Sequence, residues 1–155
     1  MFLDNRPFLA YFDGACEPQN PDGTASYGAV VLQDHKPIWT DSQIYDPPEG
    51  QRTSNNAAEY AGLIALLEWF SDQELFDAKI LIRGDSQLVI NQIFGTWRIK
   101  EAKIYTPLGH SARELIKPFR RIQCEWVARE KDTLADELAK AALKRVGVAL
   151  RLPPD

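Results

Sequence analysis

The chain alternates between short apolar runs and longer stretches with helical periodicity, which predicts a fold that mixes strands and helices. Residues 8–12 form an apolar run between Pro7 and the turn signal Asp13-Gly14, so they predict a buried strand. The next segment, 15–25, is rich in Pro, Asn, Asp and Gly and predicts a loop. Four further strands are predicted at 26–33, 38–45, 78–83 and 121–127.

The clearest helix is predicted over 55–70, where Leu63, Leu66, Leu67 and Phe70 recur at helical spacing. Shorter helices are predicted at 86–94, 104–118 and 133–146. Three strands followed by alternating helices and strands are typical of an α/β fold, in which helices cover a mixed sheet.

The length of 155 residues predicts a single domain over 1–155, with 147–155 as a C-terminal tail. No apolar run approaches the roughly 20 residues that span a bilayer. Asp4 and Arg6 interrupt what would be the apolar core of a secretory signal. The two cysteines lie far apart and lack metal-ligand spacing. We therefore expect a monomeric, cytoplasmic protein with no membrane partner.

Charge is spread unevenly along the chain. The segment 98–121 contains seven basic and two acidic residues and so carries +5, although the whole chain carries −4. A basic stripe on an acidic protein suits phosphate binding, because the acidic remainder repels phosphates elsewhere. The alternative is that these bases form a solvated helix face.

Two acidic residues directly follow predicted strands. Asp13 comes after the strand at 8–12, and Asp85 comes after the strand at 78–83 and Gly84. If these strands are parallel neighbours, both acids emerge at one edge of the sheet, where α/β proteins place their sites. The alternative for Asp85 is simple N-capping of the helix at 86–94.

Two further acids lie on predicted helices beside apolar stripes. Glu59 is in register with Leu63 and Leu66, on a face where a helix normally carries no charge. Asp136 lies beside the apolar stripe of the last helix. The alternative for each is a capping box, at 56–59 and at 133–136.

Convergence of these four acids would require cations or protons. Two unit charges about 4 Å apart repel by about 4 kcal/mol at an effective dielectric of about 20. Carboxylate oxygens favour hard cations such as Mg²⁺ or Mn²⁺. Two such ions can activate a water and stabilise a leaving oxygen on a phosphodiester.

Four sequence blocks carry a family resemblance. They read DGACEP…NPDG…YGAVV at 13–31, SNNAAEYAGLIALL at 54–67, GDSQLVINQI at 84–93 and WVAREKDTLADELAKAAL at 126–143. In order and separation these blocks resemble ribonuclease H of the type I branch. The resemblance implies a ribonuclease H-like α/β fold, with a five-stranded mixed sheet, its second strand antiparallel and helices on both faces. It also implies a two-metal endonuclease that cuts the RNA strand of RNA–DNA hybrids.

The resemblance also implies roles for individual residues. The acidic metal ligands of the family fall on Asp13, Glu59, Asp85 and Asp136. Its contacts to the sugar–phosphate backbone fall on Gly14, Asn20, Ser54, Asn55, Asn56 and Gln87. Separately, Trp97, Arg98 and Lys100 form an aromatic and basic patch suited to a DNA backbone. The alternative for Trp97 is a side chain half-buried between two helices.

The chain departs from the best-known bacterial members in two places. Its loop at 127–131 has no histidine, and 95–106 is too short for their basic protrusion. Both absences resemble an archaeal-like subgroup, some members of which also cut double-stranded RNA. In place of the histidine, Glu130 could attract an ion or accept a proton, while Arg129 or Lys131 could hold a phosphate. The alternative is that all three point into solvent.

Other functions fit the sequence less well. Ser86 lacks the second glycine of a G-x-S-x-G serine hydrolase motif, and no phosphate-binding glycine loop occurs. A catalytically silent nucleic-acid-binding domain stays open, although the presence of all four acids argues against it. A domain derived from a retroelement would have the same sequence features.

Overall fold

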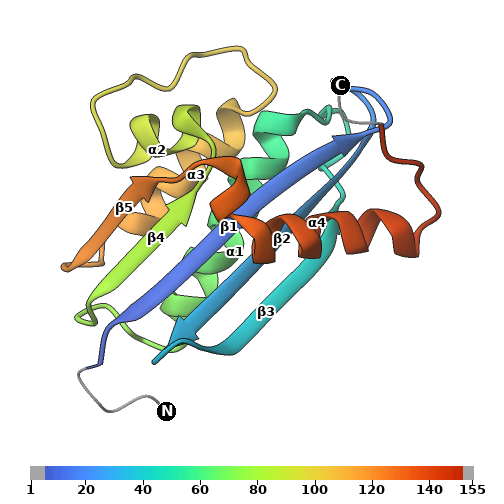
Figure 1. The fold of residues 1–155 in the computed structure, drawn as a ribbon. Helices are drawn as coiled ribbons and strands as arrows, with labels where there is room; N and C mark the ends of the chain where they lie inside the picture. The colour runs from blue at the N-terminus through green and yellow to red at the C-terminus, as the bar shows by residue number, and fades with distance from the viewer. Residues whose placement is uncertain (1–5, 152–155) are drawn as a thin grey trace.

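The computed structural model describes residues 6–151, which form one five-stranded mixed sheet covered by helices (Figure 1). The strands are β1 (Phe8–Glu17), β2 (Thr24–Gln33), β3 (Lys36–Tyr45), β4 (Ile80–Gly84) and β5 (Ile122–Trp126). Their order in the sheet is β3-β2-β1-β4-β5. The pairs β1–β2 and β2–β3 are antiparallel, whereas β1–β4 and β4–β5 are parallel. The expected mixed sheet with an antiparallel second strand is confirmed.

Helices cover both faces of this sheet, as expected (Figure 1). They are α1 (Asn55–Asp72), α2 (Gln87–Ile93), α3 (Thr106–Ile116) and α4 (Thr133–Arg145), with a short 3₁₀ turn η1 (Arg129–Lys131) before α4. On one face α1 packs against β1 and β2 and is flanked by α2 and α3, while α4 crosses β2 and its neighbours on the other. No helix within 6–151 is long and apolar enough to cross a membrane.

The main core lies between the sheet and α1. Alternate residues of β1, Phe8 and Phe12 among them, meet Leu63 and Leu67 of α1, and all four are buried. On the opposite face α4 lies very close to β2, because a Cβ on Gly28 would come within 2.1 Å of the Ala135 carbonyl oxygen. Close packing on both faces holds the start of each helix firmly against the sheet.

The structure corrects one predicted boundary that matters for the site. The strand predicted at 8–12 continues to Glu17, because β1 pairs with β2 as far as Glu17↔Thr24. The loop predicted at 15–25 therefore shrinks to the turn at 18–23. Polar composition suggested a loop, but pairing across the hairpin satisfies the backbone groups of this segment. The predicted helix at 104–118 is likewise shorter, spanning Thr106–Ile116.

The sequence predicts a single domain over 1–155 that ends in a tail at 147–155. Residues 147–151 contain no helix or strand. Residues 152–155 of the predicted tail lie outside the described residues. So does Asp4, one of the two charged residues that argue against a secretory signal.

Candidate active site

The parallel pairing of β1 and β4 brings Asp13 and Asp85 to the same edge of the sheet. The β1–β4 ladder ends at Phe12↔Gly84, and Asp13 and Asp85 are the residues that directly follow this pair along the chain. Asp85 does not cap α2, because the N-cap is Ser86, whose hydroxyl accepts a 3.2 Å hydrogen bond from the Val89 N–H. The N-capping alternative for Asp85 is therefore wrong, and its carboxylate is available to bind a ligand.

Glu59 enters the same site from the first turns of α1. The N-cap of α1 is Ser54, which accepts a 3.0 Å hydrogen bond from the Ala57 N–H, so the capping box at 56–59 is wrong. A Cβ on Gly14 would lie 2.3 Å from the Glu59 backbone nitrogen, so only glycine lets α1 approach β1 here. Glu59 is 4% exposed, and its Oε2 has no hydrogen-bond partner within 6–151.

Asp136 lies on the first turn of α4 and is half-buried. It forms an ion pair with Lys140, one turn along the helix, whose Nζ lies 2.9 Å from Asp136 Oδ2. A capping box at 133–136 is not formed, because the Thr133 hydroxyl donates to the Glu130 carbonyl oxygen instead. The four predicted acids thus come from four separate parts of the chain, and Glu59, Asp85 and Asp136 do not form the capping interactions considered for them.

The structure adds a fifth acid that the sequence prediction missed. Asp132 is fully buried, and one carboxylate oxygen from each of Asp13, Asp85 and Asp132 lies within 4.8 Å of the others. An Asp directly before a helix is typical of an ordinary N-cap, so Asp132 was not assigned to the site from the sequence. Its i, i+4 spacing from Asp136 was the available signal, since it places both acids on one side of the first turn.

Burial and mutual repulsion raise the pKa values of Asp13, Glu59, Asp85 and Asp132 and so favour their protonated forms. Burial, and then the charge of Asp85, raise the pKa of Asp13 to about 8. Burial and the charges of Asp13 and Asp85 raise the pKa of Asp132 to about 9 and that of Glu59 well above its usual range. Burial also raises the pKa of Asp85, although the Arg129 charge opposes this. All donors are carboxylate oxygens and several lack partners, so the cluster fits a hard divalent cation.

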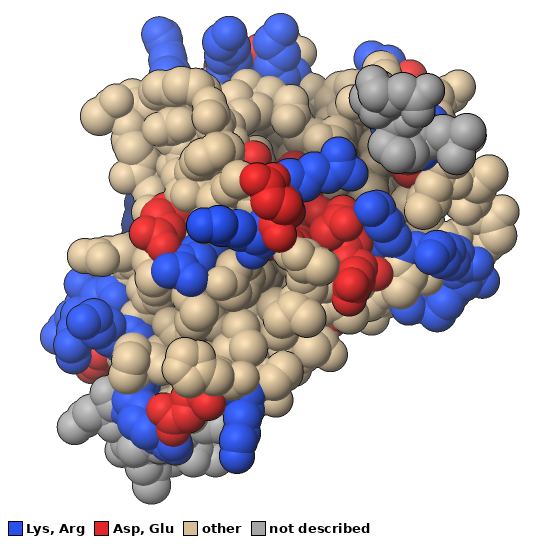
Figure 2. Space-filling model, in the orientation of Figure 1, with Lys and Arg blue, Asp and Glu red and all other residues tan. Residues whose placement is uncertain are grey.

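Asp13, Glu59, Asp85 and Asp136 line a cleft of about 690 Å³ that has basic residues at its border, whereas the fully buried Asp132 is not part of the lining. Figure 2 shows acidic side chains gathered in the middle of this face with Lys and Arg around them. Arg129, Lys140 and Arg151 are the bases that line the cleft. Arg151 belongs to the predicted tail, and its guanidinium holds Glu17 at 2.8 Å and the Cys16 carbonyl oxygen at 2.8 Å. Arg151, the last described residue, therefore lies against β1 beside the cleft.

The residues expected to contact a nucleic-acid backbone fall into two groups. Gly14, Asn20 and Asn55 line the cleft, and the Asn20 side-chain oxygen accepts a 2.9 Å hydrogen bond from the Asn55 N–H. Asn56 and Gln87 are exposed near the starts of α1 and α2. Asn20 and Ser54 therefore already have structural partners, while Asn56 and Gln87 present their amides to solvent.

The aromatic and basic patch lies apart from the acids, on the loop between α2 and α3. Trp97 is 48% exposed, and Arg98 and Lys100 are exposed on either side of the buried Ile99. Figure 2 shows Lys and Arg projecting from this loop at the top of the molecule. The patch is thus exposed for binding a partner, and it lies on a different part of the surface from the cleft.

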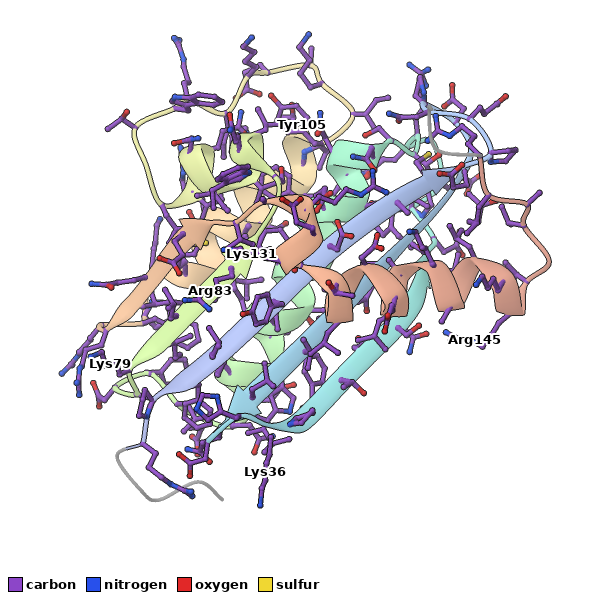
Figure 3. The ribbon with its side chains drawn as sticks, viewed as in Figure 1. Lys36, Lys79, Arg83, Tyr105, Lys131 and Arg145 are labelled. Atoms are coloured by element: carbon purple, nitrogen blue, oxygen red, sulfur yellow. The ribbon has the colours of Figure 1, made fainter. Side chains whose placement is uncertain are left out.

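The three charged residues in place of the missing histidine point to different places. All three belong to η1 and are exposed. Arg129 lines the acidic cleft, whereas Lys131 lies over the sheet near Arg83 and lines a separate hollow of about 990 Å³ (Figure 3). That hollow contains none of the clustered acids. Of the three, only Arg129 lines the acidic cleft itself.

Comparisons with known proteins agree with this arrangement. Residues 11–142 match the protein family described as "Reverse transcriptase-like". The bifunctional protein Rv2228c of Mycobacterium tuberculosis is 40% identical over 125 residues, which cover 80% of this chain and 32% of that protein. The chain thus spans about a third of the length of this curated relative.

Two solved structures share the fold at useful identity. RNase H1 from the halophilic archaeon Halobacterium salinarum matches with a TM-score of 0.76 at 35% identity, over 90% of this chain and 98% of that one. LC11-RNase H1, solved in complex with an RNA/DNA hybrid, matches with a TM-score of 0.72 at 27% identity, over 90% of this chain and 98% of that one. The family match runs from β1 to α4 and so includes every acid of the cleft. On this evidence the chain belongs to the ribonuclease H-like family.

Proposed function

We propose that this protein is a metal-dependent endoribonuclease that hydrolyses the RNA strand of RNA–DNA hybrids. The observation that carries the proposal is the convergence of acids from β1, α1, β4 and α4 on one cleft, with unpartnered carboxylate oxygens. Similarity to RNase H1 structures, one of them bound to an RNA/DNA hybrid, supports the choice of substrate.

The proposed metal ligands are Asp13, Glu59, Asp85 and Asp136. Mg²⁺ is the proposed cofactor, with Mn²⁺ as a substitute, because both prefer oxygen ligands. Two such ions, when bound, would activate the attacking water and stabilise the leaving oxygen. The chain's own contribution is to hold these carboxylates in a partly buried cleft, where close packing of α1 and α4 on the sheet fixes their positions.

The substrate would be held on both sides of the cleft. We propose backbone contacts from Gly14, Asn20, Ser54, Asn55, Asn56 and Gln87, and phosphate contacts from Trp97, Arg98 and Lys100. An enzyme that cuts RNA and spares DNA must sense the 2′-hydroxyl, which both donates and accepts hydrogen bonds. The exposed amides of Asn56 and Gln87 have both capacities.

Three finer points belong to the same proposal. Double-stranded RNA is a second candidate substrate, because it also displays 2′-hydroxyls along its minor groove. The free thiols of Cys16 and Cys124 fit a reducing compartment, which supports a cytoplasmic location. A single chain contributes every acid of the cleft, which fits a monomer.

A cleavage assay on four labelled substrates tests the proposal: hybrid, double-stranded RNA, double-stranded DNA, and hybrid with one 2′-deoxynucleotide at the cut site. We expect hybrid cleavage in Mg²⁺ and none in a chelator, with the DNA duplex and the deoxy step intact. Binding of hybrid without cleavage in Mg²⁺ or Mn²⁺ would instead identify a silent nucleic-acid-binding domain. Efficient cutting at the deoxy step would contradict recognition of the 2′-hydroxyl.

A further inference from the structure

Asp132 is the most unusual side chain in the cleft region. Its exposed fraction is 0%, and neither of its carboxylate oxygens has a hydrogen-bond partner within residues 6–151. Buried carboxylates are normally paired, because an unpaired one forfeits its hydration without compensation. A native structure that keeps such a group therefore needs a partner that is not a side chain of the described chain.

Helix capping does not explain Asp132. The residue occupies the N-cap position of α4, but its side chain makes no capping hydrogen bond. Its backbone carbonyl accepts the ordinary helical bond from the Asp136 N–H, at 3.0 Å. The Asp132 carboxylate therefore does not act as the cap of α4.

The groups that face Asp132 are mostly other acids. Burial, and then the charges of Asp13, Asp85 and Asp136, raise the pKa of its carboxyl group, while the Asp85 backbone acts in the opposite direction. The bases of the cleft serve other carboxylates, since Lys140 pairs with Asp136. Nothing basic among the described residues forms an ion pair with Asp132.

The spacing of the acids suits one cation. Oxygens of Asp13, Asp85 and Asp132 lie within 4.8 Å of one another. Oxygens on opposite sides of a single Mg²⁺ lie about 4.2 Å apart, so three ligands spaced in this way can share one ion after a small adjustment.

We propose that Asp132 is a further carboxylate ligand of the divalent-cation site, acting with Asp13 and Asp85. This inference rests on the proposed metal-dependent function. It adds a fifth acid to the four assigned from the family resemblance, and it gives the two unpartnered oxygens of Asp132 a partner. A site with this extra charge binds divalent ions more tightly than four acids would, and the cation relieves its repulsion.

Titration calorimetry with Mn²⁺ and Mg²⁺ tests the proposal without relying on cleavage. The variants are Asp132→Asn, which keeps the shape and removes the charge, Asp85→Asn as the reference ligand change, and Glu137→Gln as the control. Glu137 is exposed on the same turn of α4, so its variant removes an equal charge that faces solvent. We expect Asp132→Asn to weaken Mn²⁺ binding about tenfold or more, and Glu137→Gln to change it less than about twofold.

The outcomes separate this proposal from the proposed function. Wild-type affinity in Asp132→Asn, with weak binding in Asp85→Asn, would overturn the role of Asp132 and leave the nuclease proposal intact. Equal weakening by Asp132→Asn and Glu137→Gln would overturn it as well, because a general field effect would explain both. Absence of any divalent binding to the wild-type protein would overturn both proposals. If Asp132→Asn does not fold, anomalous scattering from Mn²⁺ in wild-type crystals decides: an Asp132 oxygen about 2.0–2.3 Å from the ion supports ligation, and one beyond about 4 Å overturns it.

Discussion

The acidic cleft and the loop between α2 and α3 (95–105) both concentrate charge, but they hold it in different ways. In and beneath the cleft, Asp13, Glu59 and Asp132 are buried, and Glu59 and Asp132 have carboxylate oxygens with no hydrogen-bond partner among the described residues. On the loop, Arg98 and Lys100 project into solvent. The contrast fits a division of labour, because buried unpaired charge binds cations strongly, whereas exposed charge binds phosphates in a salt-dependent way.

The two regions also differ in how the polar groups beneath their surface are hydrogen-bonded. The loop is irregular, yet its backbone is well satisfied: the buried amide of Gln92 donates to the Arg98 carbonyl oxygen at 3.0 Å and to the Tyr105 hydroxyl at 3.1 Å. Tyr105, labelled in Figure 3, stacks on Tyr60 of α1. The loop thus has hydrogen-bonded groups inside and charges outside, whereas the acidic site has buried carboxylate oxygens without partners. Perturbing each region should therefore have distinct signatures.

The largest expected effect comes from removing a charge from the cleft. Asp85→Asn keeps the side-chain shape but removes a proposed ligand, so we expect hybrid cleavage to fall by at least about 10³-fold. The metal-free variant should melt at the same or a higher temperature than the wild type, because repulsion with Asp13 is relieved. Single-turnover cleavage and thermal unfolding measure the two effects. A wild-type cleavage rate would remove Asp85 from the metal site.

The second prediction concerns stability against pH in the absence of metal. The raised pKa values of Asp13 (about 8) and Asp132 (about 9) mean that the folded protein keeps protons that the unfolded chain loses near pH 4. Stability from these groups is therefore full at low pH and is lost as pH rises through about 8–9. We expect a fall in melting temperature on the order of 10 °C between about pH 5 and about pH 9.

Saturating Mg²⁺ should restore much of that loss, because the cation replaces the protons. The matched control is the same pH series in Asp132→Asn, whose decline should be shallower. A metal-free melting temperature that rises steadily across this range would contradict the clustering of buried acids.

The cleft itself could be anticipated only in part from the sequence. Asp13 and Asp85 follow apolar strands, and their meeting needed only a parallel pairing, which the structure has. Asp132 was missed because its burial depends on how α4 packs against β2 at Gly28, a long-range contact with no local signature. Likewise, β1 was cut short because its last residues are polar and are held by pairing with β2.

The loop was harder to interpret for a related reason. Its bases were visible in the sequence, but the sequence did not say whether Trp97 would be buried between helices. The structure leaves Trp97 48% exposed, whereas Ile99 and Tyr105 of the same loop are buried.

The third prediction tests the exposed amides between the two regions. Gln87→Ala should raise KM for hybrid about threefold to tenfold, the size of one or two lost hydrogen bonds, with kcat and melting temperature nearly unchanged. Asn20→Ala is the instructive comparison, because Asn20 also accepts the Asn55 N–H and should lose stability as well. A fall in stability for Gln87→Ala equal to that for Asn20→Ala would give Gln87 a structural role instead.

The fourth prediction addresses the loop. Changing Arg98 and Lys100 to Gln should weaken hybrid binding several-fold at moderate salt and reduce the slope of log K against log salt by about 2. Lys36 and Lys79 provide the control, since they lie at the end of the sheet away from the acids (Figure 3). Their double change to Gln removes the same charge and should leave the slope as it is. An equal effect in both double variants would mean that net charge, not the loop, governs binding.

The smallest expected effect lies at the border of the cleft, in the η1 turn. This turn belongs to the loop in which the best-known bacterial members carry a histidine and this chain does not. Glu130 is exposed there, and Arg129 is the η1 residue that lines the cleft. An exposed carboxylate can attract a departing ion but cannot hold it, because water competes for both. We therefore expect Glu130→Gln to slow multiple turnover several-fold or less and to leave the single-turnover rate unchanged, with Glu137→Gln as the charge-matched control. A loss as complete as that of Asp85→Asn would move Glu130 into the metal site and overturn the assignment of Asp136 as the fourth ligand.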